Sequence, residues 1–182
     1  MTPRVVGVLL AAGAGRRYGK PKVLVDGWLD LAVRALRDGG CAEVVLVLGA
    51  AGVTAPPGAA TVIARDWSEG LSASVRAGLA QADRMHGEFA ALHVIDTPDV
   101  GAAVVARVID RALASRAGLA RAYFGERPGH PVVLARRHWR DVLAAVSGDT
   151  GAGSYLRRRA DVENVDCSDL ASGRDVDEAA RP

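Results

Sequence analysis

The chain of 182 residues is long enough for one folded domain, which would bury about 70% of the surface of the unfolded chain. Its 23 basic and 21 acidic residues leave a formal charge of +2 and are spread along the sequence, so the charge does not indicate a nucleic-acid binder. The two cysteines, Cys41 and Cys167, are too few for a disulfide framework or a metal-binding motif. We therefore expect reduced thiols in a cytoplasmic protein.

The apolar N-terminus imitates a signal peptide. It carries only Arg4 before the apolar run, however, and that run leads directly into Arg16 and Arg17 rather than into a cleavage site. No window approaches the roughly 18 consecutive apolar residues that a membrane-spanning helix requires. We therefore expect neither a secretion signal nor a membrane partner.

Apolar runs rich in β-forming residues alternate with segments of helical spacing. The predicted strands are Val5–Leu10, Val44–Leu48, Thr61–Ala64, Phe89–Ile95 and Ala120–Phe124. Helical spacing occurs at Leu29, Val33 and Leu36, and again at Val104, Val108 and Leu113. This alternation predicts an α/β fold in which helices flank a mostly parallel sheet. We expect one domain over residues 1–182, with a polar tail that frays from about residue 171.

A glycine-rich loop follows the first predicted strand. Glycines at 13, 15 and 19 would let backbone N–H groups approach phosphate oxygens, and Arg16, Arg17, Lys20 and Lys22 could neutralise their charge. The P-loop pattern does not fit, because no Ser or Thr follows the lysine. The dinucleotide fingerprint does not fit either, because Tyr18 replaces its third glycine. In addition, Pro21 lies where the helix required by that fingerprint would run. The loop indicates a nucleoside triphosphate site of another kind.

A magnesium site is expected where the fourth predicted strand ends. Asp96 follows that apolar strand, and Thr97-Pro98 would turn its carboxylate outward at the edge of the sheet. Magnesium takes few protein ligands and keeps waters and substrate oxygens. Asp175 or Asp177 could supply a second carboxylate, with Asp99 as a weaker substitute.

Six ordered segments, which span nearly the whole chain, resemble one family. Residues 10–22 match L-A-A-G-x-x-x-R-x-G-x-P-K, and residues 66–79 match D-W-x-x-G-L-S-x-S-V-R-x-G-L. Four shorter matches follow, to D-x-P at 96–98, G-H-P-V at 129–132, G-D-x-G-A at 148–152 and D-V-D at 175–177. The chain is therefore similar to the MobA/MocA group of nucleotidyltransferases, and specifically to the molybdenum cofactor cytidylyltransferases.

The resemblance implies a Rossmann-like three-layer α/β/α fold of the nucleotide-diphospho-sugar transferase kind. It implies transfer of CMP from CTP to the terminal phosphate of a molybdenum-pterin cofactor, with Mg²⁺ as cofactor and a molybdoenzyme or its chaperone as a possible partner. Lys22, Arg17 and Asp96 would be catalytic, and Asp96, Asp175 and Asp177 would bind metal. The nucleotide-binding residues would be Leu10, Ala11, Ala12, Gly13, Arg17, Lys22, Asp66, Gly70 and Ser72. His130, Pro131 and Asp149 would contact the acceptor.

Several alternatives stay open. Ala12 and Pro21-Lys22 favour cytosine over guanine by analogy with the family, which leaves guanylyl transfer and cytidylyl transfer to another phosphorylated small molecule. A non-catalytic nucleotide-binding or cofactor-insertion protein is a further hypothesis, because the chain departs from the family pattern after Asp177 and at Gly153. A dinucleotide-binding oxidoreductase is the least favoured, because of Tyr18 and Pro21.

Overall fold

The computed structural model describes residues 2–179. A seven-stranded sheet has the order β3-β2-β1-β4-β6-β5-β7. Its strands are β1 (Val5–Leu10), β2 (Glu43–Leu48), β3 (Ala59–Ile63), β4 (Phe89–Val94), β5 (Leu119–Phe124), β6 (Arg127–Ala135) and β7 (Glu163–Asp166). In the part of the chain that the structure describes, β6 alone runs antiparallel to its neighbours, β4 and β5. The expected mostly parallel α/β sheet is therefore confirmed.

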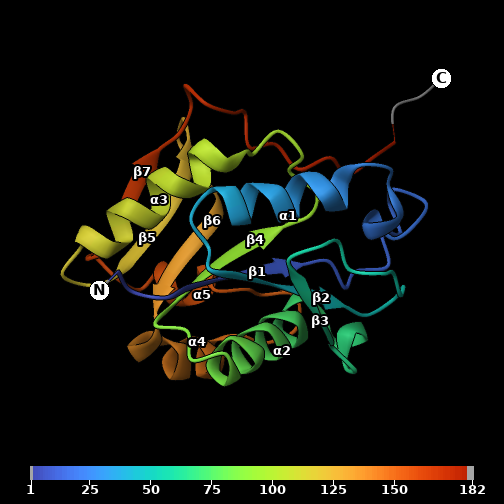
Figure 1. The fold of residues 1–182 in the computed structure, drawn as a ribbon, viewed down its shortest axis with the longest axis horizontal. Helices are drawn as coiled ribbons and strands as arrows, with labels where there is room; N and C mark the ends of the chain where they lie inside the picture. Colours follow the sequence, from blue (N-terminus) through green and yellow to red (C-terminus); the bar gives the residue numbers. More distant parts are fainter. Residues whose placement is uncertain (1, 180–182) are drawn as a thin grey trace.

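Helices cover both faces of the sheet (Figure 1). The helices α1 (Trp28–Asp38) and α3 (Ala102–Ala114) pack on one face, where their buried residues join one apolar cluster. The helices α2 (Leu71–Arg84), α4 (Trp139–Ala145) and α5 (Gly153–Leu156) pack on the other. Short 3₁₀ turns lie at Lys22–Leu24, Trp67–Glu69 and Arg136–His138. This three-layer arrangement leaves the carboxyl edge of the parallel strands open.

The central strands carry apolar residues on both sides because both of their faces are covered. All six residues of β1 are buried, as are five of the six in β2. Small residues set the spacing between the layers: a side chain on Gly78 of α2 would overlap Val8 of β1. The low aromatic content of the chain therefore suits a core of closely packed aliphatic side chains.

The predicted strands are present: the first has the predicted bounds, and those of the other four differ by one or two residues. The strands β6 and β7 were not predicted. The first half of β6 contains Pro128, Gly129 and Pro131, which ordinarily interrupt a strand, and β7 is a short run of mostly polar residues. No helix within residues 2–179 has both the length and the apolar character needed to cross a membrane.

The tail after residue 171, which we expect to fray, is hydrogen-bonded to the loop after β4. Asp99 Oδ2 accepts hydrogen bonds from the backbone and hydroxyl groups of Ser172 and from the Gly173 N–H. The Val176 N–H donates to the carbonyl oxygen of Asp96 at 2.8 Å. These bonds tie the polar tail to the loop after β4, and composition alone did not indicate this anchoring.

Candidate functional site

A cleft of about 750 Å³ lies at the open edge of the sheet. The last residues of β1 and β4 reach this edge, as does the loop that follows each of them. Because β6 is antiparallel to β4, its first residues, up to His130, reach the same edge. The topology thus brings the loop after β1, Asp96, and the start of β6 around one cavity, where open α/β folds bind ligands.

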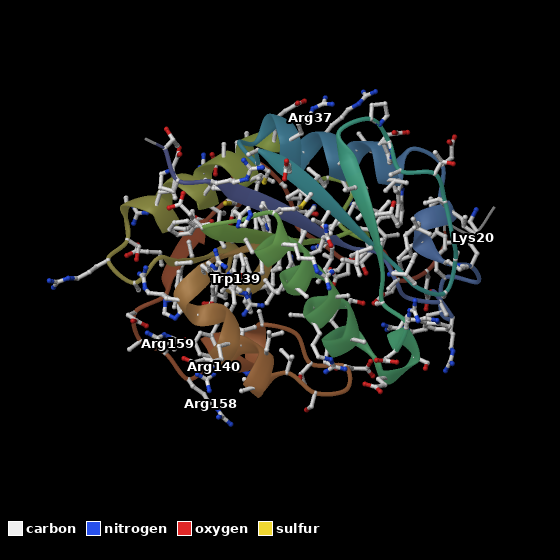
Figure 2. All side chains as sticks on the ribbon, turned by 60° about the horizontal axis from the view of Figure 1, so that its bottom comes forward. Lys20, Arg37, Trp139, Arg140, Arg158 and Arg159 are labelled. Carbon is white, nitrogen blue, oxygen red and sulfur yellow. The ribbon has the colours of Figure 1, made fainter. Side chains whose placement is uncertain are left out.

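The loop after β1 forms one wall of this cleft. Ala11 and Ala12 are hydrogen-bonded to the neighbouring strand and its loop, through the Ala11 N–H to Val47 O and the Ala50 N–H to Ala12 O. Gly13 faces open space, while Gly15 has a φ of +60° and accepts a hydrogen bond from the Gly19 N–H. A rigid floor therefore leads into a turn that exposes backbone to the cleft. Lys20 lies at the edge of the molecule rather than in the cleft (Figure 2).

Lys22 joins two carboxylates at the centre of the site. Its Nζ donates to Asp96 Oδ2 at 2.9 Å and to Asp177 Oδ1 at 3.1 Å. The Lys22 side chain is only 13% exposed and that of Asp96 25%. Burial alone would lower the pKa of Lys22, but hydrogen bonds and charges from Asp96 and Asp177 raise it, so Lys22 is an ammonium ion at neutral pH.

Arg17 extends this charged group toward solvent. Its Nη1 lies 3.2 Å from Asp177 Oδ2, and its side chain is 78% exposed. An ion pair this exposed contributes little to stability, so the arginine can move to an incoming anion at small cost. Two cations and two carboxylates therefore meet at one point of the cleft.

Asp175 brings a third carboxylate into the cleft from the tail. Burial, followed by the charges of Asp96 and Asp177, raises the pKa of its carboxyl. Asp96 Oδ1 is buried and accepts no hydrogen bond within the described residues. Nearby carboxylates and an unused buried oxygen both favour a bound cation.

These oxygen donors fit a hard divalent ion such as Mg²⁺ or Mn²⁺. Among residues 2–179, no three His, Cys, Asp or Glu side chains are assembled in metal-coordinating geometry. The Lys22 ammonium lies between Asp96 and Asp177 instead. Asp96, Asp175 and Asp177 all line the cleft, and they stay the predicted metal ligands.

His130 lies in the cleft near Asp96, and His93 lies near His130. His93 of β4 is buried, and burial followed by the charge of His130 lowers its pKa to about 3. For His130, burial and the charge of Arg121 lower the pKa to about 4, although Asp96 opposes that shift. Both imidazoles are neutral at pH 7, so neither supplies positive charge to an anionic substrate.

The structure brings most of the predicted site residues into the cleft. The residues that line it are Leu10, Ala11, Ala12, Gly13, Arg17, Lys22, Gly70, Asp96, His130, Asp149, Asp175 and Asp177. Their roles remain predictions. Asp149 lies against Gly70, where an added side chain would overlap its Oδ1.

Three predicted site residues do not line the cleft. Asp66 is exposed beside the turn that precedes α2, and Pro131 is buried in β6. Ser72 is buried within the first turn of α2, and its N–H donates to Gly148 O, so it does not point at a base or sugar. Gly70 precedes α2, and no side chain caps the start of this helix.

Arg121, Arg127 and Ser74 also line the cleft, although they were not predicted from the sequence. Arg121 lies on a strand whose alternation of small and large residues gave no functional signal. Ser74 lies within the D-W-x-x-G-L-S-x-S motif, two residues after Ser72, the serine predicted to bind the nucleotide. A helical projection of that motif could have identified it, since residues 71 and 74 share a helix face.

The fold and the cleft define a nucleotide-binding α/β protein, and comparison with known proteins gives its class. Residues 7–163 match the family model of the MobA-like NTP transferase domain. The chain therefore belongs to this family of nucleotidyltransferases.

Individual relatives are similar over almost the full length. The chain is 36% identical to nicotine blue oxidoreductase of Paenarthrobacter nicotinovorans over 191 residues, covering 96% of this chain and 93% of that protein. It is 26% identical to Rv0371c of Mycobacterium tuberculosis, with a TM-score of 0.76 over 91% of this chain and 89% of the other. A manganese complex of Rv0371c gives 24% identity and a TM-score of 0.70 over 90% and 88%.

A cytidylyltransferase has the same fold at lower identity. The 2-C-methyl-D-erythritol 4-phosphate cytidylyltransferase of Thermus thermophilus is 22% identical, with a TM-score of 0.69 over 95% of this chain and 92% of the other. This likeness confirms the expected fold.

Proposed function

We propose that this protein is a divalent-metal-dependent cytidylyltransferase that transfers CMP from CTP to the terminal phosphate of a molybdenum-pterin cofactor. An acceptor phosphate oxygen would form a bond to the α-phosphorus, while the bond from that phosphorus to the pyrophosphate oxygen breaks. Pyrophosphate would leave with the bonding electron pair. The observation that carries the proposal is the meeting of Lys22 and Arg17 with Asp96 and Asp177 at the edge of the sheet.

The chain's own residues would bind and orient the nucleotide. The backbone of residues 10–13 forms the floor on which the nucleotide would lie. Lys22 would exchange its carboxylate partners for phosphate oxygens and neutralise charge that develops on the leaving pyrophosphate. Arg17, which is more exposed, would contact the outer phosphates.

A bound Mg²⁺ would screen the negative charges of the two substrates from one another. Asp96, Asp177 and Asp175 would hold it. The acceptor phosphate is already an anionic nucleophile, so no general base is assigned, and catalysis would depend on orientation and charge neutralisation. His130 and Asp149 line the cleft and would contact the acceptor.

Reduction of an organic substrate is a second candidate function. It is favoured by the 36% identity to nicotine blue oxidoreductase, which exceeds the identity to the solved nucleotidyltransferases. An oxidoreductase of this kind would need an electron donor such as NADH or NADPH in the same cleft. Lys22 and Arg17 would then bind the pyrophosphate of the dinucleotide, with no need for metal.

Calorimetric titration with CTP, GTP and NADH, each with and without Mg²⁺, separates these functions. Magnesium-dependent preference for CTP supports cytidylyl transfer, and a pyrophosphate-release assay with the pterin acceptor then tests the reaction. Preference for GTP indicates guanylyl transfer, and metal-independent NADH binding indicates the oxidoreductase. Nucleotide binding without pyrophosphate release, with the acceptor present, would indicate a non-catalytic binding protein.

A further inference from the structure

Arg121 is a half-buried guanidinium that lines the cleft from β5. The pairing of β5 with β6 shifts register between Arg121 and Tyr123. Such irregularities re-aim side chains beside ligand sites. The Arg121 Nε donates to Gly129 O at 3.2 Å, which fixes the side chain and leaves both terminal nitrogens without a hydrogen-bond partner among residues 2–179.

A second arginine converges on the same point. The position that a Cβ on Gly153 would occupy lies 3.5 Å from Arg121 Nη1, 3.7 Å from Arg121 Nη2 and 3.6 Å from Arg157 Nη1. The guanidinium groups of Arg121 and Arg157 therefore both lie beside the space that a side chain at Gly153 would fill. Burial and the charge of Arg157 both lower the pKa of Arg121, as expected for neighbouring cations.

This pair has no counter-charge within the described residues, whereas several other arginines have one. Arg107 pairs with Asp169, Arg111 with Glu163 and Arg159 with Asp161. Within residues 2–179, neither Arg121 nor Arg157 lies within 4.0 Å of a carboxylate oxygen. Arg121 is half-buried and Arg157 is exposed, and like charges this close repel one another unless an anion joins them.

We propose that Arg121 and Arg157 form a subsite for the phosphate monoester dianion of the second substrate. Two guanidinium groups carry two positive charges and offer paired N–H donors, which match the charge and geometry of a phosphate monoester. A carboxylate would neutralise only one of them. This inference rests on the proposed function for its role, since the bound phosphate would be the group that receives the nucleotide.

Inorganic phosphate is the probe for this subsite, with His130 as the reporter. Arg121 is one cause of the low pKa of His130, alongside burial, and Asp96 acts in the opposite direction. Inorganic phosphate is a monoanion at the pH of this titration, and bound to Arg121 it would still offset that positive charge. We therefore expect saturating phosphate to raise the pKa of His130 from about 4 in an NMR titration, which only four histidines make simple to assign.

Variants separate the subsite from the loop after β1, which can also bind phosphate. Arg121→Gln should weaken phosphate binding about tenfold or more and abolish its effect on His130. Gly153→Asp places a carboxylate against both guanidinium groups and should weaken phosphate binding more than Gly153→Asn, which has the same shape but no charge. Arg158→Gln is the matched control, because Arg158 is exposed and points outward near α5 (Figure 2).

The proposal is overturned if phosphate leaves the pKa of His130 unchanged. It is equally overturned if Arg17→Gln weakens phosphate binding while Arg121→Gln does not. It is also overturned if Gly153→Asp binds phosphate as well as Gly153→Asn does. Phosphate binding to Arg121 in a protein that binds no CTP would refute the proposed function alone. Metal-dependent CTP binding with no phosphate effect on His130 would refute the subsite alone.

Discussion

Lys22 donates a 2.9 Å hydrogen bond to Asp96 across a separation of 74 residues. The lysine ends the glycine-rich loop after β1, and the aspartate follows β4, which is paired in parallel with β1. Parallel pairing brings the two strand ends together, so the cation and the carboxylate meet without any local sequence relationship. The pair holds both side chains at the cleft, and in the proposed reaction Lys22 would turn from Asp96 to the phosphate oxygens.

The first prediction concerns Asp96. Asp96→Asn keeps the shape of the side chain but removes a charge that would hold metal. We expect pyrophosphate release to fall by about 10²–10³-fold, the range found when one preorganised electrostatic contact is lost. The thermal midpoint should change little, because Asp96 is part of a polar cluster rather than the core. A coupled pyrophosphate assay and circular dichroism melting measure the two effects.

Asp141→Asn is the control for Asp96→Asn, because Asp141 is exposed on α4 and lies outside the cleft. It should retain wild-type activity. Full activity in Asp96→Asn would remove this residue from the mechanism, and a large loss of stability would show that its role is structural.

The second prediction concerns the anchor of the tail. Asp99→Ala removes the acceptor of three hydrogen bonds that hold Ser172 and Gly173. Because these residues precede Asp175 and Asp177, we expect weaker metal dependence of nucleotide binding although Asp99 itself would not touch the metal. The free energy of unfolding should fall by only about 1–2 kcal/mol. Magnesium titration of nucleotide binding and urea unfolding measure these quantities.

Asp110→Ala serves as the control for the tail, since Asp110 is exposed on α3, outside the cleft. Cleavage within residues 171–179 by a protease should be faster in Asp99→Ala than in Asp110→Ala. Equal cleavage and equal magnesium dependence would contradict the role assigned to Asp99.

The sequence predicted the parallel half of the sheet because those strands are buried on both faces and read as continuous apolar runs. It predicted the glycine-rich loop and Asp96 because each has a local signal, namely glycine spacing with cations and a strand that ends in Asp-Thr-Pro. It did not predict β6, since the Pro and Gly residues in its first half outweigh the apolar run that follows. Arg121 was missed for a different reason: its proximity to Arg157 depends on how β5 faces α5, which local sequence does not encode.

The third prediction contrasts two glycines of the loop after β1. Gly15 has a φ of +60°, and a Cβ there would overlap the carbonyl oxygen of Lys20, so Gly15→Ala must rearrange the turn. Gly13 has no atom within 4 Å of an added Cβ. Gly13→Ala should therefore leave the thermal midpoint unchanged or slightly higher, while its methyl group narrows the cleft and weakens CTP binding.

Differential scanning fluorimetry and CTP titration on both variants test this contrast. Gly15→Ala should lose both stability and binding, whereas Gly13→Ala should lose binding alone. Unchanged CTP affinity in Gly13→Ala would exclude the floor of the cleft from the nucleotide site.

The last prediction concerns stability in acid. The pKa of His93 is about 3 in the folded protein and about 6.5 in an unfolded chain, so between these pH values the unfolded chain binds a proton that the folded chain excludes. Stability is therefore full above about pH 6.5 and falls as the pH decreases through this window, by up to about 1.4 kcal/mol per pH unit for this residue. His93→Leu should reduce the loss of stability in acid. It should leave the free energy of unfolding at pH 7 equal or higher, because Nδ1 of His93 has no hydrogen-bond partner within the described residues.

Urea unfolding at pH 4.5, 5.5 and 7 measures how the free energy of unfolding depends on pH, with His86→Gln as an exposed control that should match wild type. An unchanged slope in His93→Leu would mean that His130, which has the same direction of shift, accounts for the acid sensitivity.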